Sequence, residues 1–403
     1  MDPTAPETKL SFPPGFLLGA ASSAHQSEGD NTNSDWWHYE SLGRLPKSGQ
    51  ASDHYNRYEQ DFELAHSIGL NAMRISIEWA RIEPEAGRWN SQAIEHYKKV
   101  LKAMKEQGLT RVVTLWHWTL PQWAAKRGGF ENPEIVEAFA RYAWFVAQNL
   151  GTEIEQWITL NEPELYALNS YKRGVRPPFV RSAYSTWRVL ENLIEAHRRA
   201  VRAIKEALGQ VPVGLAKNSP YFAPYRKYHV LDRLATITAN LFNLYFLEKI
   251  EKQLDFIGLN FYTRQLLKFD WRQGAVDMDN ARAAMEPGDL QHSDMGWFLF
   301  PEGIYHVLKI LRKFKKPIYI TENGLADAAD TRRRKFILET LEWVKKAMAE
   351  GADVKGYFYW SLTDNYEWES GFGPRFGLAE VDYATQARTL RESAKVFKEI
   401  EIK

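Results

Sequence analysis

Two glutamates, each beside an asparagine, are the residues of this sequence best suited to chemistry. Glu162 lies in the string Thr159-Leu-Asn-Glu-Pro163, and Glu322 lies much later, in Ile320-Thr-Glu-Asn-Gly324. An opposed pair of carboxyl groups can cleave an acetal, because one protonates the departing oxygen while the other attacks the sugar carbon or directs water to it. A lone glutamate is as readily a salt-bridge partner, but two in such similar surroundings favour a catalytic pair.

The positions of both glutamates depend on the elements that precede them. Eight apolar, β-branched or aromatic segments alternate with amphipathic stretches along the whole chain, a pattern typical of a closed parallel barrel surrounded by helices. We therefore expect an α/β fold, a single (β/α)8 TIM barrel with long βα loops that covers residues 1–403 as one domain, with residues 1–10 as a flexible tail. The predicted strands are Phe16–Ser23, Ala72–Trp79, Arg111–Trp118, Ile154–Leu160, Val211–Lys217, Phe256–Tyr262, Pro317–Thr321 and Val354–Leu362. The predicted helices include Ser91–Gln107, Pro133–Leu150, Trp187–Leu208, Leu231–Gln253 and Thr331–Glu350.

In such a barrel, polar side chains at the carboxyl ends of the strands face the active site. Glu162 follows the fourth predicted strand and Glu322 the seventh, so we expect the two to face each other across the barrel mouth. The other strand ends carry amides, imidazoles, carboxylates and indoles, which suit a neutral polyhydroxylated ligand. The rival architecture is a doubly wound open sheet, whose nucleotide fingerprint is absent. The nearest string, Gly371-Phe-Gly373-Pro-Arg-Phe-Gly377, has the wrong spacing and contains a proline.

Composition narrows the classes of partner and cofactor. Lys and Arg number 52 against 51 Asp and Glu, so no broad field attracts nucleic acid or an anionic membrane. The chain has no cysteine, which excludes disulfides and thiolate metal sites, and its ten histidines lack metal-ligand spacing. No apolar stretch approaches a membrane span, and residues 1–14 lack the apolar core of a secretion signal. We expect no metal, no organic cofactor and a cytoplasmic location, and leave the oligomeric state open.

Seven motifs in sequence order resemble the signatures of glycoside hydrolase family 1. The resemblance covers nearly the whole chain and includes the strings around both glutamates. One five-residue match can arise by chance, whereas seven in order cannot reasonably do so. The motifs are Phe16–Gly29, Asn71–Trp79, Leu115–Trp118, Thr159–Pro163, Asp255–Tyr262, Ile320–Gly324 and Tyr357–Trp368, the last followed by Arg375–Leu378.

The resemblance implies a retaining β-glycosidase that acts on a small-molecule β-glycoside and needs no cofactor. Glu162 would be the general acid/base and Glu322 the nucleophile, with carboxyl groups about 5–5.5 Å apart. Asn161 would hold the sugar 2-hydroxyl, and Arg74 and Tyr262 would lie beside Glu322, where they favour its ionised form. The remaining substrate-binding residues would be Gln26, His117, Asn260, Trp360, Glu367 and Trp368.

Several alternatives stay open beside this interpretation. A carbohydrate-binding pseudoenzyme on the same fold has no need of two opposed carboxylates, whereas a transglycosylase would use the same residues as a hydrolase. A 6-phospho-β-glycosidase is the nearest rival among enzymes, and Glu367 in the sugar pocket argues against a phosphorylated substrate. Glucosides, galactosides and fucosides are not distinguished, because Gln26 and Glu367 can bind either O4 epimer. The linkage and aglycone preferences also stay open.

Other residues near the motifs have structural interpretations. We expect Glu78 to pair with Arg81, His25 to be a structural hydrogen-bonding residue and Tyr359 to be core. The basic run Arg332–Lys335 is predicted to lie on a solvated helix face. Three tryptophans are more consistent with barrel filling than with the cleft: Trp79, Trp116 and Trp118.

Two segments depart from the family pattern or extend it. The chain is short for the family, which suggests trimmed loops after the fifth and sixth strands. In Gly174–Phe179, Phe179 stands where a glycine commonly follows the proline, which leaves the shape of the aglycone side open. The segment Pro220–His229 is dense in aromatic residues and reads either as an aglycone wall or as surface packing.

Overall fold

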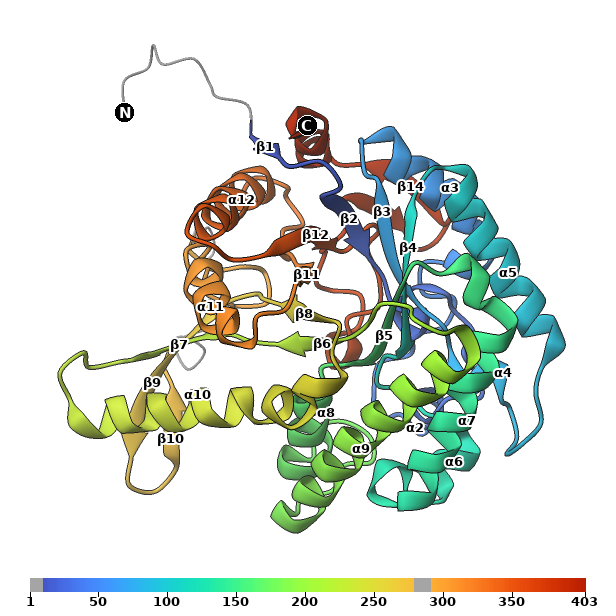
Figure 1. Ribbon diagram of the computed structural model, residues 1–403, viewed down its shortest axis with the longest axis horizontal. Helices are drawn as coiled ribbons and strands as arrows, with labels where there is room; N and C mark the ends of the chain where they lie inside the picture. Colours follow the sequence, from blue (N-terminus) through green and yellow to red (C-terminus); the bar gives the residue numbers. More distant parts are fainter. Residues whose placement is uncertain (1–9, 279–290) are drawn as a thin grey trace.

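The computed structural model describes residues 10–278 and 291–403, and it is built around a closed parallel barrel (Figure 1). The expected N-terminal tail lies outside the described residues except for residue 10. Eight strands form the barrel in the order β11-β12-β2-β3-β4-β5-β6-β8. They are β2 (Leu17–Ala21), β3 (Ala72–Ser76), β4 (Thr110–Trp116), β5 (Gln156–Asn161), β6 (Val213–Asn218), β8 (Phe256–Asn260), β11 (Ile318–Asn323) and β12 (Val354–Trp360). Each overlaps one predicted strand, so the predicted barrel is confirmed.

Helices cover the outside of the barrel (Figure 1). Several begin at a side chain that caps free backbone N–H groups: Asn132 accepts from the N–H of Glu134, and Pro133 fills the first helical position, where no N–H is needed. The longer helices are α3 (His54–Ser67), α5 (Ser91–Glu106), α7 (Pro133–Leu150), α9 (Ala183–Leu208), α10 (Val230–Ile250), α11 (Gly303–Leu311) and α12 (Arg333–Ala349). The shorter ones are α1 (Ala24–Ser27), α2 (Asp35–Ser41), α4 (Trp79–Ile82), α6 (Gln122–Lys126) and α8 (Pro163–Ala167).

In the part of the chain that the structure describes, three small sheets lie outside the barrel. Strands β1 (Ser11–Phe12) and β15 (Glu401–Ile402) pair near the chain ends, and β13 (Ala379–Asp382) forms a hairpin with β14 (Ala387–Leu390). The third sheet has the order β10-β9-β7, from β7 (Tyr221–Pro224), β9 (Arg264–Asp270) and β10 (Gly274–Asp277). This sheet and α10 occupy the loops after the fifth and sixth barrel strands, β6 and β8 (Figure 1). Across the described ranges, no helix has both the length and the apolar character that a membrane span requires.

The barrel is a filled core and not a pore. Its interior is filled by small, branched and aromatic side chains. Gly19 leaves room for Phe358, since a Cβ at this glycine would lie 2.6 Å from the phenylalanine ring. Buried interior residues include Ala72, Val112, Ile158, Phe256 and Phe358.

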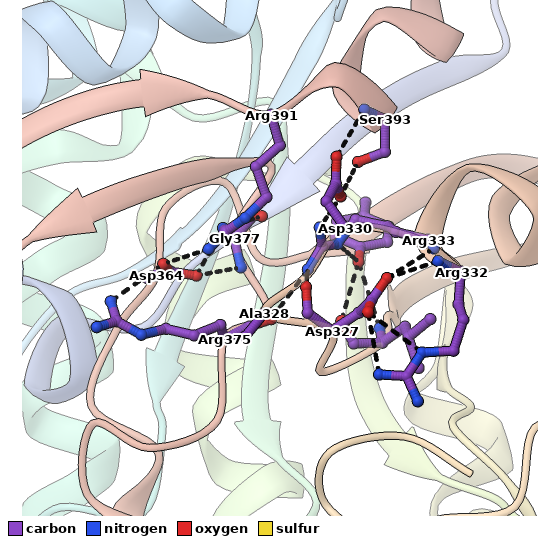
Figure 2. A network of polar contacts seen from close by, with 12 residues as sticks. Asp327, Ala328, Asp330, Arg332, Arg333, Asp364, Arg375, Gly377, Arg391 and Ser393 are labelled. Atoms are coloured by element: carbon purple, nitrogen blue, oxygen red, sulfur yellow. Dashed lines mark hydrogen bonds and ion pairs between the residues drawn. The ribbon is translucent and has the colours of Figure 1, made fainter. Parts of the chain in front are cut away.

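The basic run at the start of α12 is not a solvated face, and that prediction was wrong for two of its members. Arg333 is fully buried, and Arg332 is mostly buried. Both donate to Asp327 (Figure 2). The side chain of Arg332 donates to the Asp327 carboxylate. The backbone N–H of Arg333 donates to the same carboxylate, and its guanidinium donates to the Asp327 backbone carbonyl. Arg333 also pairs with Asp330. Only the exposed Arg334 and Lys335 behave as expected.

The network in Figure 2 joins the loops that follow β11 and β12. Asp364 is fully buried and accepts from both Nη atoms of Arg391 at 2.9 Å, from Arg375 at 3.2 Å and from the N–H of Gly377 at 2.8 Å. The carbonyl of Arg375 in turn accepts from Arg333 at 2.9 Å. Glu322 lies at the end of β11, ahead of the first of these loops, and Glu367 lies in the second, so the network joins the two chain segments that carry these carboxylates.

The other structural expectations have mixed outcomes. His25 bonds Glu40 at 3.0 Å and Tyr359 is fully buried, as expected. Glu78 does not pair with Arg81, because that arginine donates to Glu28 at 2.8 Å. The carboxylate of Glu78 instead accepts from the Thr119 hydroxyl at 2.8 Å. Trp79 and Trp116 are core residues, whereas Trp118 lines the cleft described below.

Candidate active site

A cavity of about 270 Å³ opens at the carboxyl ends of the barrel strands. Eleven residues were predicted for the site, and nine of them line this cavity. The other two, Arg74 and Asn260, are fully buried and bond to the lining residues. The nine are Gln26, His117, Asn161, Glu162, Tyr262, Glu322, Trp360, Glu367 and Trp368.

Glu162 occupies the turn between β5 and α8. Its backbone is left-handed, with φ 45° and ψ 53°, and its N–H donates to the carbonyl of Ala216 at 2.8 Å. Pro163 begins α8 directly afterwards, so the chain reverses direction at the glutamate. The side chain accepts a hydrogen bond from Asn260 Nδ2 at 2.9 Å.

Glu322 lies near the end of β11 and receives two strong donors. Arg74 Nη1 donates to Oε1 at 2.6 Å, and the Tyr262 hydroxyl donates to Oε2 at 2.7 Å. Arg74 comes from β3 and Tyr262 follows β8, so three separate strand ends define the direction of this carboxylate. A guanidinium and a phenol in these positions favour the ionised form.

Amides link the two glutamates beneath the cavity. Asn161 Oδ1 accepts from Arg74 Nη2 at 2.7 Å and from Asn260 Nδ2 at 3.1 Å. On its other side, Asn161 Nδ2 lies 3.1 Å from His117 Nε2. Burial and the nearby Arg74 charge lower the pKa of His117, so its neutral ring can accept from this amide.

The two glutamates have unequal surroundings although both are buried. Burial raises the pKa of Glu162 to about 8, with the negative charge of Glu322 as the second cause. Sequence reasoning named only that charge, whereas burial is the larger effect. Burial also raises the pKa of Glu322, but Arg74 and Tyr262 oppose the rise. Glu162 is therefore the member of the pair that keeps a proton at neutral pH.

A third carboxyl group lies elsewhere on the cavity wall. Glu367 accepts from Trp360 Nε1 at 3.0 Å and from Gln26 Nε2 at 3.5 Å. Its pKa is raised to about 8, mainly by burial. Trp368 follows it, with its ring centroid 4.9 Å from that of Trp118. This wall combines hydrogen-bonding groups with indole rings, the combination that a sugar requires.

The outer part of the cavity holds charged residues that sequence reasoning missed. Arg176 donates twice to Glu369, at 2.9 Å each, and its guanidinium lies 4.3 Å above the ring of Trp118. The sequence signal for Arg176 was the departure from the family pattern in residues 174–179, which we had interpreted through Phe179. That residue is not part of the cavity lining and packs against Tyr39.

The same side of the cavity is formed by the helix that follows Glu162. After α8 the chain continues as a π-helical turn, η3 (Leu168–Arg173), and π-turns occur often at functional sites. Leu165, Asn169 and Arg173 from this stretch line the cavity. Of the segment Pro220–His229, Pro220 lines the cavity, while the next residues form β7. No group of three or more His, Cys, Asp or Glu within the described ranges has the arrangement of a metal site.

Comparisons with known proteins agree with this geometry. The chain is 35% identical to β-glucosidase A of Thermotoga maritima, with 95% of this chain and 96% of that protein covered, and 33% identical to a β-galactosidase of Sulfolobus acidocaldarius, with 97% and 95% covered. The alignment to the first spans 435 positions, more than the 403 residues here, so that relative carries insertions.

A solved structure and a family model extend the likeness to the fold. The β-glycosidase from Pyrococcus horikoshii superposes with a TM-score of 0.90 at 39% identity, with 97% of this chain and 95% of that chain covered. The model of glycosyl hydrolase family 1 matches residues 8–250 and 242–403. The matches include both glutamates and every strand of the barrel. The protein therefore belongs to glycosyl hydrolase family 1.

Proposed function

We propose that this glycosyl hydrolase is a retaining β-glycosidase in which Glu322 is the nucleophile and Glu162 the general acid and base. The observation that carries the proposal is the asymmetry of the pair. Arg74 and Tyr262 hold Glu322 ready to attack, while burial keeps a proton on Glu162.

The first step breaks the glycosidic bond. The Glu322 carboxylate attacks the anomeric carbon, and Glu162 gives its proton to the departing oxygen, so the aglycone leaves as a neutral alcohol. Positive charge develops on the sugar ring in the transition state. Asn161, held by Arg74 and Asn260, is oriented to donate to the 2-hydroxyl, a contact that strengthens as this charge develops.

The second step releases the sugar. Once Glu322 is an ester its negative charge has gone, and with it one of the two causes that raise the pKa of Glu162. Glu162 then accepts a proton from water as that water attacks the anomeric carbon from the face the aglycone left. The two inversions give a product with the original β configuration. The proton returned to Glu162 restores the starting state.

For the substrate, we propose unphosphorylated β-glucosides, β-galactosides and β-fucosides. Gln26 and Glu367 supply an amide and a carboxyl group that bind hydroxyls in either orientation at O4. The names of two relatives, a β-glucosidase and a β-galactosidase, support the first two of these substrates. The acceptor side is bounded by Arg173, Arg176 and Glu369, which favour a polar aglycone.

The test of mechanism is the configuration of the first product. Proton NMR of a nitrophenyl β-glucoside reaction should show the β-anomer of glucose before mutarotation. An initial α-anomer would reject the double displacement, and failure to cleave any member of a nitrophenyl glycoside panel would favour a binding protein. Products with an added sugar at high substrate concentration would show that transglycosylation competes with hydrolysis.

Two expectations from the sequence remain proposals. We propose that the barrel acts as one catalytic domain, which limited proteolysis tests through the survival of a single core. The cytoplasmic location is also still a prediction, and fractionation of cells that produce the protein tests it.

A further inference from the structure

One helix of the fold exposes an apolar face. Helix α10 packs one side on the small sheet of β7 and β9, and it lies at the outside of the molecule, away from the barrel axis (Figure 1). Its outer side carries Val230, Leu234, Ile237 and Leu241, which are between 54% and 75% exposed. Spacings of four, three and four residues place these side chains on one stripe of the helix.

The exposed Arg233 lies beside the start of this stripe, and the helix beyond it lacks charge over most of its length. From Leu234 to Leu247 the sequence has no Asp, Glu, Lys or Arg. Phe242 and, on the neighbouring α9, Trp187 extend the apolar area, at 39% and 49% exposed. Monomeric proteins rarely leave such a continuous area in water. We call these six residues, Trp187, Val230, Leu234, Ile237, Leu241 and Phe242, the α10 patch.

A groove continues the α10 patch toward the barrel. It has a volume of about 210 Å³ and an almost wholly apolar lining, which includes Leu168, Leu190 and the patch residues Trp187 and Phe242. A row of exposed aliphatic side chains beside an apolar groove offers both parts of a packed interface, a ridge and a hollow.

We propose that the α10 patch is the contact between two copies of this chain, related by a two-fold axis that crosses α10. In a two-fold contact the same surface meets itself, so an α10 helix would pack antiparallel against the partner's. The stripe is symmetric about its centre between Ala235 and Thr236. Leu234 of each copy therefore meets the partner's Ile237, Val230 meets the partner's Leu241, and the spacing resembles the seam of a two-helix coil.

The size of the patch agrees with such a contact. Six large apolar side chains, each about half exposed, offer on the order of 100 Å² apiece. Two copies together would bury on the order of 1,200 Å², within the range of specific protein interfaces. The six patch residues carry no charge, so their own burial has no ionic desolvation penalty.

The first experiment measures mass in solution by light scattering across a dilution series. The wild-type chain should have the mass of a dimer, and Leu234→Glu should have that of a monomer, because the dimer would bury two unpaired carboxylates. Leu42→Glu is the matched control: Leu42 is 59% exposed but lies at the end of α2, outside the patch, and this variant should stay dimeric. A circular dichroism spectrum like that of the wild type would show that the monomeric Leu234→Glu variant is folded.

A mixing experiment tests the antiparallel arrangement. Leu234→Glu and Ile237→Lys should each be monomeric alone, whereas a one-to-one mixture should form dimers, since the introduced carboxylate then faces the introduced ammonium. No dimer in the mixture would overturn the antiparallel pairing. A monomeric wild-type chain would overturn the proposal itself. So would a monomer that sediments with phosphatidylcholine–phosphatidylglycerol vesicles, which would assign the patch to a membrane surface.

Discussion

Two of the buried clusters of arginine and carboxylate within the described residues, the network of Figure 2 and the active site, differ in how completely their charges are matched. In the cluster of Figure 2, Asp364 accepts from two guanidinium groups and a backbone N–H, and Asp327 accepts from Arg332 and from two backbone N–H groups that include that of Arg333. In the active site, Arg74 donates to Glu322 but not to Glu162, and within the described residues Glu162 receives a hydrogen bond only from Asn260.

This difference separates structural charge from catalytic charge. A buried carboxylate with several donors is stable in its ionised form and is inert. Glu162 lacks those donors, so burial raises its pKa into the range where it can release and recover a proton. The active site therefore contains a buried carboxyl group, Glu162, that has few hydrogen-bond donors, and the surrounding core keeps it in place.

The largest expected effect comes from removal of the nucleophile. Glu322→Ala should lower kcat by about 10⁴-fold or more for every substrate, because no other group can form the covalent intermediate. Steady-state kinetics with a nitrophenyl and a dinitrophenyl glucoside measure the loss. Equal activity of the variant and the wild type would remove Glu322 from the mechanism.

Glu162→Ala provides the contrast within the same cluster. A dinitrophenyl aglycone leaves without a proton, so the first step should survive while the ester on Glu322 accumulates. Azide needs no general base and should restore turnover, with a β-glycosyl azide as the product. An α-azide from this variant would mean that the two glutamates have exchanged roles.

The next effect concerns the structural cluster. Arg333→Ala should reduce the free energy of unfolding by about 3–5 kcal/mol, because it leaves buried acceptors without their cation. The adjacent Arg334→Ala is the control, since its pair with Glu399 is about half exposed and is worth about 0–1 kcal/mol. Urea unfolding measures both. Similar losses from the two variants would contradict the distinction between matched and exposed charge.

The pH dependence tests the unmatched acid directly. kcat/KM should fall as the pH rises through about 8, where Glu162 loses its proton. Arg74→Met should move the acidic limb of the profile upward, because Arg74 holds down the pKa of Glu322. The Glu162→Gln variant should still act on a dinitrophenyl glucoside, and its profile should lack the basic limb. If the basic limb kept the wild-type midpoint in this variant, the limb would belong to another group.

The same raised pKa makes stability depend on pH. The folded state keeps the Glu162 proton up to about 8, whereas the unfolded chain loses it near 4.5. This contribution is fully present below 4.5 and is lost as the pH rises toward 8, so the free energy of unfolding falls over that window. Glu162→Gln should make the decline less steep, as urea unfolding at several pH values would show. An unchanged slope would mean that Glu162 has its ordinary pKa.

The smallest effect is a proton exchanged on binding. Glu367 has a pKa of about 8 in the empty cavity, and sugar hydroxyls that donate to it favour its ionised form. Binding of an uncharged sugar analogue at neutral pH should therefore release part of a proton. Calorimetry in two buffers of different ionisation enthalpy measures the release, and Glu367→Gln should remove it.

The protonated Glu367 also weakens the charge argument against phosphorylated sugars, so a 6-phosphoglucoside belongs in the substrate panel.

The sequence predicted the parts of the molecule that depend on local pattern. Periodic apolar runs located all eight barrel strands, and the motifs at their ends located the residues around Glu162 and Glu322. The errors concern partners that are distant along the chain. Arg81 pairs with Glu28 and not with the nearby Glu78. Arg333 is buried because it pairs with Asp330 and donates to the carbonyl of Arg375. A charge run has the same appearance in sequence whether it faces water or a buried acid.

The left-handed backbone at Glu162 affects how the enzyme can be redesigned. An alanine there keeps a Cβ in a conformation that costs roughly 1–2 kcal/mol, whereas glycine adopts it freely. Glu162→Gly would thus relieve local strain while it opens a space beside the anomeric carbon. Incoming nucleophiles other than water, such as thiols or small acids, could enter that space, so this backbone angle makes glycine the preferred starting point for a bond-forming catalyst.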